Sequence, residues 1–143
     1  MKKIVIGIGI ILALVVCVVF IFQQNKSTNF EDIVSLKTEE IACIEVEKRV
    51  GDTLERRINI DKKEEIQTFL NEFSGLKLKK SNGISGYNDV YFIQIKPDDI
   101  HLDYLITVPD NNRISIHHYS QNATPMFYEI KNNGKVNLEK FFQ

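Results

Sequence analysis

The sequence predicts an α+β fold, in which an N-terminal transmembrane helix precedes one antiparallel β-sheet packed on a single main helix. Three observations lead to this prediction. Residues 4–22 are 19 consecutive positions without a charged or polar side chain. A later segment has the apolar spacing of an amphipathic helix. The remaining chain alternates between apolar and polar residues in short runs, which Gly, Pro, Asn and Asp separate as they do between hairpin strands.

The composition limits the classes of function. The 143-residue chain carries 18 Lys and Arg against 19 Asp and Glu, a formal net charge of -1. This balance excludes a polybasic nucleic-acid binder and an acidic disordered tail. With 43% hydrophobic residues and three prolines, the chain has the composition of a folded protein.

The apolar run of residues 4–22 predicts a membrane anchor. A helix of 19 residues rises about 28 Å, close to the hydrocarbon thickness of a bilayer. Lys2 and Lys3 precede the run, whereas Lys26 beyond it is soon followed by two acidic residues. The positive-inside rule then predicts a single-pass protein of the cell membrane, with a cytoplasmic N-terminus and an extracellular C-terminal domain.

Two alternatives to an uncleaved anchor remain open. Lys2 and Lys3 before an apolar run also resemble a secretory signal, but residues 23–29 contain no pair of small residues typical of a cleavage site. Lipid attachment at Cys17 is the second alternative, although five more apolar residues follow this cysteine. The interpretation preferred here has an anchor over residues 1–22, a tether and juxtamembrane segment over 23–40, and an extracytoplasmic α+β domain over 41–143.

The extracytoplasmic domain is expected to begin with a hairpin and a helix. Residues 41–50 and 54–60 both alternate, and the Gly51-Asp52 turn between them predicts an antiparallel pair. Asp61 with Glu64 has the spacing of a capping box for a helix over residues 62–74. The apolar stripe of that helix consists of Ile66, Phe69, Leu70 and Phe73. Gly75 suits the left-handed position that follows a last helical turn.

Further strands are expected at short intervals. They cover residues 76–80, 90–96, 101–108, 113–119 and 126–130. Because neighbouring strands are only about 11 residues apart, they are expected to pair as antiparallel hairpins rather than as parallel strands with crossovers. A short helix over residues 138–142 ends the chain. The sheet is expected to have one face on the helix of residues 62–74 and one wet face.

Several segments carry a family likeness. They are Ile44 to Val46, Asp61 to Leu70, the YNDV of residues 87–90, and the YFIQIK and LITV strands. In this order, behind a lysine-led apolar segment, they resemble small membrane-anchored or lipoprotein-like proteins of unknown function from low-GC Gram-positive bacteria. The resemblance covers residues 41–142 and implies an anchored domain outside the cell. It brings no catalytic residue and no cofactor.

The residues capable of chemistry are few. His101, Asp103 and His117 could meet across neighbouring strands of the wet face and bind a metal ion. Cys43 is interpreted as a buried small apolar group rather than a nucleophile. The first hairpin is expected to carry cross-strand ion pairs, such as Glu47 with Arg57.

A cluster of aromatic residues gives the candidate binding surface. Tyr119, Phe127 and Tyr128 lie around the loop of residues 120–125, and an exposed aromatic ring there could anchor a partner. The hypothesis favoured by the sequence is therefore a non-enzymatic, membrane-tethered extracytoplasmic module. Its expected partner is an envelope protein or a wall component, in an accessory, immunity or exclusion role. The alternative is an envelope metal-binding protein or enzyme that uses His101 and His117.

Overall fold

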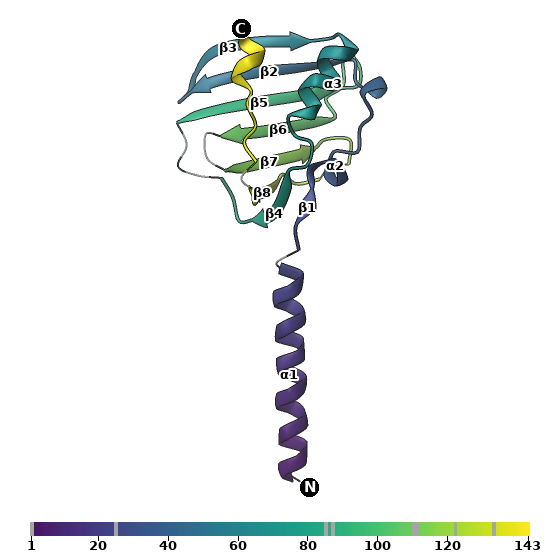
Figure 1. Ribbon diagram of the computed structural model, residues 1–143, viewed down its shortest axis with the longest axis vertical. Coiled ribbons are helices and arrows are strands. Elements are labelled where there is room, and N and C mark those ends of the chain that lie inside the picture. Colours follow the sequence, from purple (N-terminus) through teal and green to yellow (C-terminus); the bar gives the residue numbers. More distant parts are fainter. Residues whose placement is uncertain are drawn as a thin grey trace.

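An eight-stranded antiparallel sheet forms the centre of the structure (Figure 1). The computed structural model describes residues 2–24, 26–84, 86, 88–109, 112–121, 123–132 and 134–143. The strands lie in the order β1-β4-β8-β7-β6-β5-β2-β3. Their bounds are Thr28–Asn29 for β1, Cys43–Val50 for β2, Thr53–Ile60 for β3, Lys77–Ser81 for β4, Asp89–Lys96 for β5, Tyr104–Pro109 for β6, Arg113–His118 for β7 and Met126–Ile130 for β8.

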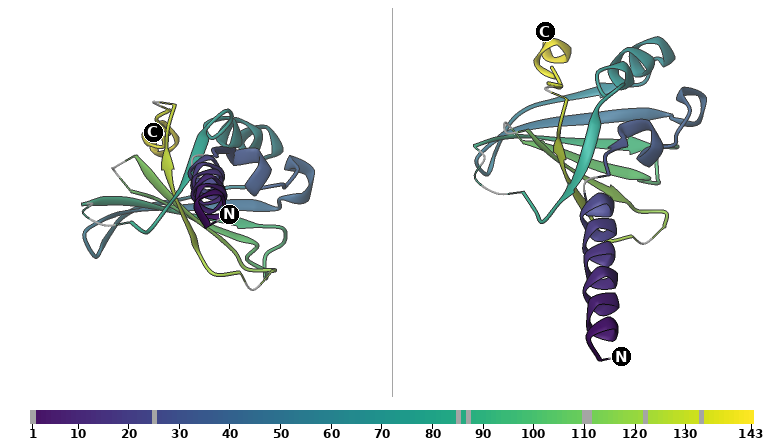
Figure 2. Two further views of the ribbon diagram at one scale, coloured as in Figure 1. Left: turned by 90° about the horizontal axis from the view of Figure 1, so that it is seen from below. Right: turned by 60° about the horizontal axis from the view of Figure 1, so that its bottom comes forward.

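One long helix precedes the sheet, and short helices cover one face of it. The helices are α1 (Lys2–Gln24), α2 (Phe30–Ile33), η1 (Thr38–Glu40), α3 (Lys63–Asn71) and η2 (Glu139–Phe142). Figure 2 shows α2, α3 and η2 on the same side of the sheet, with the core between them and the strands. The other side, called the open face below, carries no helix of the described chain. Phe69 of α3 contacts Phe141 of η2, with ring centroids 5.0 Å apart, so η2 closes the core beside α3.

The predicted strands of the folded part are confirmed, and no end differs by more than three residues. The hairpin of β2 and β3 turns at Gly51, whose φ of 56° lies in the left-handed region. Gly75 also has positive φ, 74°, after the end of α3. The predicted capping box is wrong, because the helix begins after Lys62 and no side chain caps it. The predicted turn residues Asp110, Asn111, Asn122 and Asn133, and Tyr87 of the YNDV segment, lie outside the described residues.

The predicted α+β fold class is wrong. The structure is mostly one large antiparallel sheet, and α3, the main helix on that sheet, has only nine residues. Residues assigned to a tether form β1, and the predicted strand of residues 76–80 forms β4, which lies between β1 and β8 rather than beside its neighbours in sequence. The structure is therefore mainly β.

The predicted membrane anchor is also corrected. The apolar run does form a helix, α1, and its described side chains, residues 11–22, are exposed. A membrane span needs about 20 predominantly apolar residues in one helix. Within the part of the chain whose side chains are described, no helix is long and apolar enough to cross a membrane. The prediction of a single-pass cell-membrane protein with an extracellular domain depended on such a helix and is overturned with it.

Part of the predicted tether belongs to the folded body. Phe30 and Val34 are 3% and 6% exposed and lie in the core. The Phe30 ring stacks on Phe73, with centroids 4.8 Å apart. Residues 28–40 thus fold with the sheet, whereas the sequence predicted a tether and juxtamembrane segment over residues 23–40.

The order of the strands determines where one edge is exposed. The chain leaves β3 at one edge of the sheet, passes through α3, and enters β4 near the opposite edge (Figure 1). It then returns to β5 beside β2, and β5 to β8 follow as a meander back to β4. As a result, β4 has β8 on one side and only the two residues of β1 on the other.

Candidate functional site

The side of β4 that faces away from β8 is an incompletely paired strand edge. Only Leu78 and Lys77 of β4 pair with β1, opposite Thr28 and Asn29. On its other side β4 pairs with β8 as far as Ser81. The last part of β4 is therefore a sheet edge, where backbone groups face outward instead of toward a neighbouring strand.

The hydrogen bonds around β4 identify which backbone groups face outward. The Phe30 N–H donates to the Leu76 carbonyl at 3.1 Å, toward β1, and the Lys131 N–H donates to the Lys77 carbonyl at 2.9 Å, toward β8. Backbone direction alternates along a strand, so even-numbered residues of β4 face the β1 side. The N–H and C=O of Lys80 consequently point to the open edge, beyond the last residue of β1.

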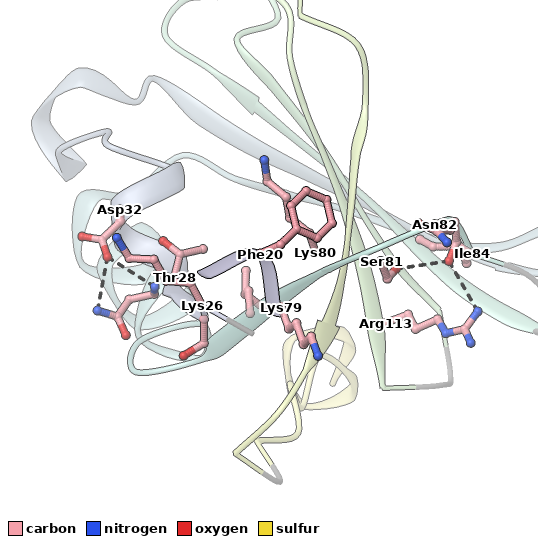
Figure 3. A pocket seen from close by; sticks show the side chains of 14 residues that line it. Phe20, Lys26, Thr28, Asp32, Lys79, Lys80, Ser81, Asn82, Ile84 and Arg113 are labelled. Atoms are coloured by element: carbon pink, nitrogen blue, oxygen red, sulfur yellow. Dashed lines mark hydrogen bonds between the residues drawn. The ribbon is translucent and has the colours of Figure 1, made fainter. Parts of the chain in front are cut away.

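A long groove runs along this edge (Figure 3). It encloses about 1390 Å³. Residues from five parts of the chain line it: Phe20, Lys26–Asn29, Asp32, Leu78–Ile84 and Arg113. Small-molecule sites typically have about 300–1,000 Å³. The size of the groove and its position along a strand edge are better suited to an extended chain than to a compact ligand.

Positive charge surrounds the groove. Lys26, Lys79, Lys80 and Arg113 line it, against the single carboxylate of Asp32. That carboxylate already accepts hydrogen bonds from the backbone N–H and the side-chain amide of Asn29, at 3.3 and 3.2 Å.

The cations lie on both sides of β4. The Arg113 guanidinium donates to the Gly83 carbonyl at 3.4 Å. Lys79 and Arg113 share the open face, where Glu129 stands opposite both of them, and Lys80 lies on the helix-covered face. Lys26 and Lys80 form no ion pair with another described residue. The positive charge that no described carboxylate pairs with therefore lies at Lys26 and Lys80, and this side of the groove favours an anionic ligand.

The aromatic cluster predicted from the sequence does not form one surface. Tyr119 is 40% exposed, and its ring lies 3.9 Å from that of His117. Phe127 is half-buried on the open face, opposite Ser81 and Ser115. Tyr128 is 2% exposed and faces the core. Phe127 and Tyr128 are consecutive in a strand, so their side chains point to opposite faces, and burial removes Tyr128 from any binding surface.

The histidines are also separated. The His101 ring contacts Asp98, with Nδ1 at 2.9 and 2.8 Å from the two carboxylate oxygens. Hydrogen bonds from the His101 ring and from backbone amides lower the pKa of Asp98 to about 2. Asp103 contacts His118, at 3.2 Å, rather than His101 or His117. Among the described residues, no group of three or more His, Cys, Asp or Glu side chains could hold a metal ion.

A serine, a histidine and an aspartate do meet at His118, but not as a catalytic relay. Ser120 Oγ lies 2.7 Å from His118 Nε2, and Asp103 Oδ1 lies 3.2 Å from the same nitrogen. A catalytic triad needs the carboxylate on Nδ1 and the nucleophile on Nε2, so that the base can accept a proton while the acid orients it. The His118 ring stacks on the buried Tyr104, with centroids 4.1 Å apart, which gives it a packing role.

Two other sequence-derived candidates also have structural roles. Burial raises the pKa of the Cys43 thiol, and this keeps it in the weakly nucleophilic protonated form. The predicted ion pair between Glu47 and Arg57 is confirmed, and Arg49 joins it at 2.9 Å. These hairpin charges neutralise each other and leave little net charge for a ligand.

The groove was not predictable from local sequence patterns. The signal available was the KLKKS of residues 77–81, where a buried Leu78 alternates with lysines, a pattern typical of an edge strand. Lys26 and Arg113 are far from this segment in sequence, so only the fold brings them to it. No family model, no curated protein and no solved structure matches the chain.

Proposed function

We propose that the protein is a non-enzymatic binding module whose groove along β4 binds an extended, acidic segment of another protein. The observation that carries this proposal is the open backbone edge at Lys80, flanked by cationic side chains. Strand addition to an exposed sheet edge is a recurrent mode of peptide binding, in which main-chain hydrogen bonds supply affinity and side-chain contacts supply selectivity.

Charge supports an acidic ligand in particular. A carboxylate-bearing peptide would meet Lys80 and Lys26 on one side of the edge and Arg113 on the other. Interactions of this kind steer association and select partners more than they add raw affinity. The proposal therefore includes a strong dependence of binding on ionic strength, because the groove is exposed to solvent and its charges are screened by salt.

A different role for edge lysines predicts a different result. Lysines on edge strands also protect sheet proteins from pairing with one another. If Lys80 had only that role, an acidic peptide would have no measurable affinity for the groove. Binding experiments separate the two roles directly.

The test is a titration of a fluorescent seven-residue peptide of alternating valine and glutamate, followed by anisotropy. The full chain is kept in solution with a mild non-ionic detergent, because the side chains of residues 11–22 are exposed and apolar. We expect the peptide to bind, and Lys80→Glu to weaken it about tenfold or more, which corresponds to about 1.4 kcal/mol. Arg56→Glu, on the far edge strand β3, makes the same change in net charge and should leave affinity within about twofold of wild type.

Two control ligands complete the test. A peptide with lysine in place of glutamate should not bind. Inorganic polyphosphate carries dense negative charge without an extended peptide backbone, and it should bind more weakly than the acidic peptide. Equal binding by wild type and Lys80→Glu would refute the proposal, and a preference for polyphosphate would replace it with a polyanion site.

A further inference from the structure

β1 is a strand of only two residues, Thr28 and Asn29. β1 pairs with β4 for only two residues, although neither a proline nor a glycine occurs in residues 26–29 to end it. In the observed register, Thr28 is opposite Leu78 and Asn29 is opposite Lys77. Each step toward the N-terminus on β1 is one step toward the C-terminus on β4. Extension of β1 would therefore place Ser27 opposite Lys79 and Lys26 opposite Lys80.

Charge opposes this extension. Directly opposed residues of an antiparallel pair lie on the same face with their Cβ atoms about 4.5–5.5 Å apart, and like charges at such positions are destabilising. Lys26 and Lys80 would be such a pair. Both are exposed, so each remains fully solvated when the strands stay apart, and no buried apolar side chain at residues 26 or 27 would compensate for their approach.

The same geometry defines what would fit in the vacant position. A segment that follows the line of β1 along β4 can hydrogen-bond to the Lys80 N–H and C=O. Its residue opposite Lys80 lies on the same face as Lys80, with Lys26 at the rim of the groove. An acidic residue there converts a repulsive position into an attractive one. Neighbouring residues of the segment point to the open face, toward the side where Lys79 and Arg113 lie.

We infer that the bound acidic segment becomes an additional strand, antiparallel to β4 with a carboxylate opposite Lys80, and that repulsion between Lys26 and Lys80 keeps this position vacant in the free protein. The added strand rests on the proposed function. The repulsion concerns the free protein alone. The chain thus holds its own residues 26–27 away from an edge that they would otherwise cover.

The experiment uses the exchange rate of the Lys80 amide in the full chain, measured by NMR, and the anisotropy assay with the valine–glutamate peptide. In Lys26→Glu the opposed pair becomes attractive, so β1 should extend over the edge. We expect the Lys80 amide of the free variant to exchange about three- to tenfold more slowly than in wild type. The peptide should bind at least about fivefold more weakly, since the variant's own chain competes for the edge.

A matched variant separates this mechanism from the loss of one cation. The double variant Lys26→Glu and Lys80→Glu restores like charges opposite each other. Its amide at residue 80 should exchange at the wild-type rate, and it should bind the valine–lysine peptide in preference to the valine–glutamate peptide.

Different results would contradict the repulsion between Lys26 and Lys80 and the added strand. An unchanged exchange rate at Lys80 in free Lys26→Glu would overturn the repulsion, even if wild type binds the acidic peptide as proposed. If Lys26→Glu slows exchange of the Lys80 amide but still binds the peptide as tightly as wild type, the added strand is overturned. Covering the edge would then have no effect on peptide binding. Failure of wild type to bind the peptide would refute the proposed function and the added strand together.

Discussion

Glu47 is a buried carboxylate on the open face of the sheet, and its two arginine partners are largely exposed. Its side chain is 6% exposed and accepts hydrogen bonds from Arg49, at 2.9 Å, and from Arg57. Arg49 in turn lies over the Phe92 ring, 5.2 Å from its centroid. Burial alone would raise the pKa of Glu47, but the two arginine hydrogen bonds outweigh it and the pKa is lowered. The charged form of Glu47 therefore stabilises the fold.

Glu47→Gln tests this balance. The amide keeps the shape of the side chain but loses the charge that both guanidinium groups bind. We expect the free energy of unfolding at neutral pH to fall by about 1–3 kcal/mol, measured by urea denaturation. Glu45→Gln is the control two residues away on the same strand, where the carboxylate is 21% exposed and pairs with Lys96 at 2.9 Å and with Arg57 at 3.3 Å. It should cost less than about 1 kcal/mol.

The pH dependence gives a second measurement on the same variant. Because the pKa of Glu47 is lower in the folded protein than its ordinary value of 4.5, its stabilising contribution is complete above that value. The contribution is lost as the pH falls through the lowered pKa. The difference in stability between wild type and Glu47→Gln should therefore shrink as the pH is lowered below 4.5. A difference that stays constant down to acid pH would show that the charge of Glu47 is not responsible.

At the scale of elements, α3 is held to the sheet by aromatic side chains. Phe69 is 1% exposed and lies between Phe73 and Phe141, with ring centroids 5.7 and 5.0 Å away. Ile66, one turn earlier on the same stripe, is fully buried. The helix has no side-chain cap at its start, so its position depends mainly on this packing.

Phe69→Ala removes the centre of that contact. We expect a loss of about 3–5 kcal/mol in the free energy of unfolding, seen as a lower urea midpoint. Thr68→Ala changes an exposed neighbour on the same helix, whose hydroxyl donates to the Glu64 carbonyl one turn earlier. Its effect should stay within about 0.5 kcal/mol. Equal midpoints for Phe69→Ala and wild type would mean that α3 does not pack as described.

The elements themselves could be predicted from the sequence because their signals are local. Alternation and turn residues located β2 to β8, and the apolar stripe located α3. The capping box was misplaced because the residue at the N-cap is Lys62, one position after the predicted Asp61. The aromatic cluster failed for a related reason. Tyr119, Phe127 and Tyr128 are close in sequence, but strand alternation turns Tyr128 into the core.

At the scale of the whole molecule, the candidate site depends on long-range topology. Lys26, Lys80 and Arg113 are separated by more than 30 residues at each step, and only the passage of the chain through α3 brings β4 next to β1 and β8. No periodic pattern in the sequence encodes the order of the strands. The same limitation affected the fold class, because local patterns did not reveal the two-residue β1 or the position of β4 between β1 and β8. The anchor prediction inferred the location of the whole protein from one apolar run. Among the described residues, no helix is long and apolar enough to cross a membrane.

The central claim is that the backbone of β4 at Lys80 pairs with an acidic strand. The measurement that tests it most directly is amide exchange by NMR on the wild-type full chain, with and without saturating valine–glutamate peptide. The account predicts that the Lys80 amide, which faces the open edge, becomes strongly protected by the peptide, while those of Lys79 and Ser81, which face β8, change little. A bound peptide that leaves the Lys80 amide exchanging as fast as in the free protein would contradict it.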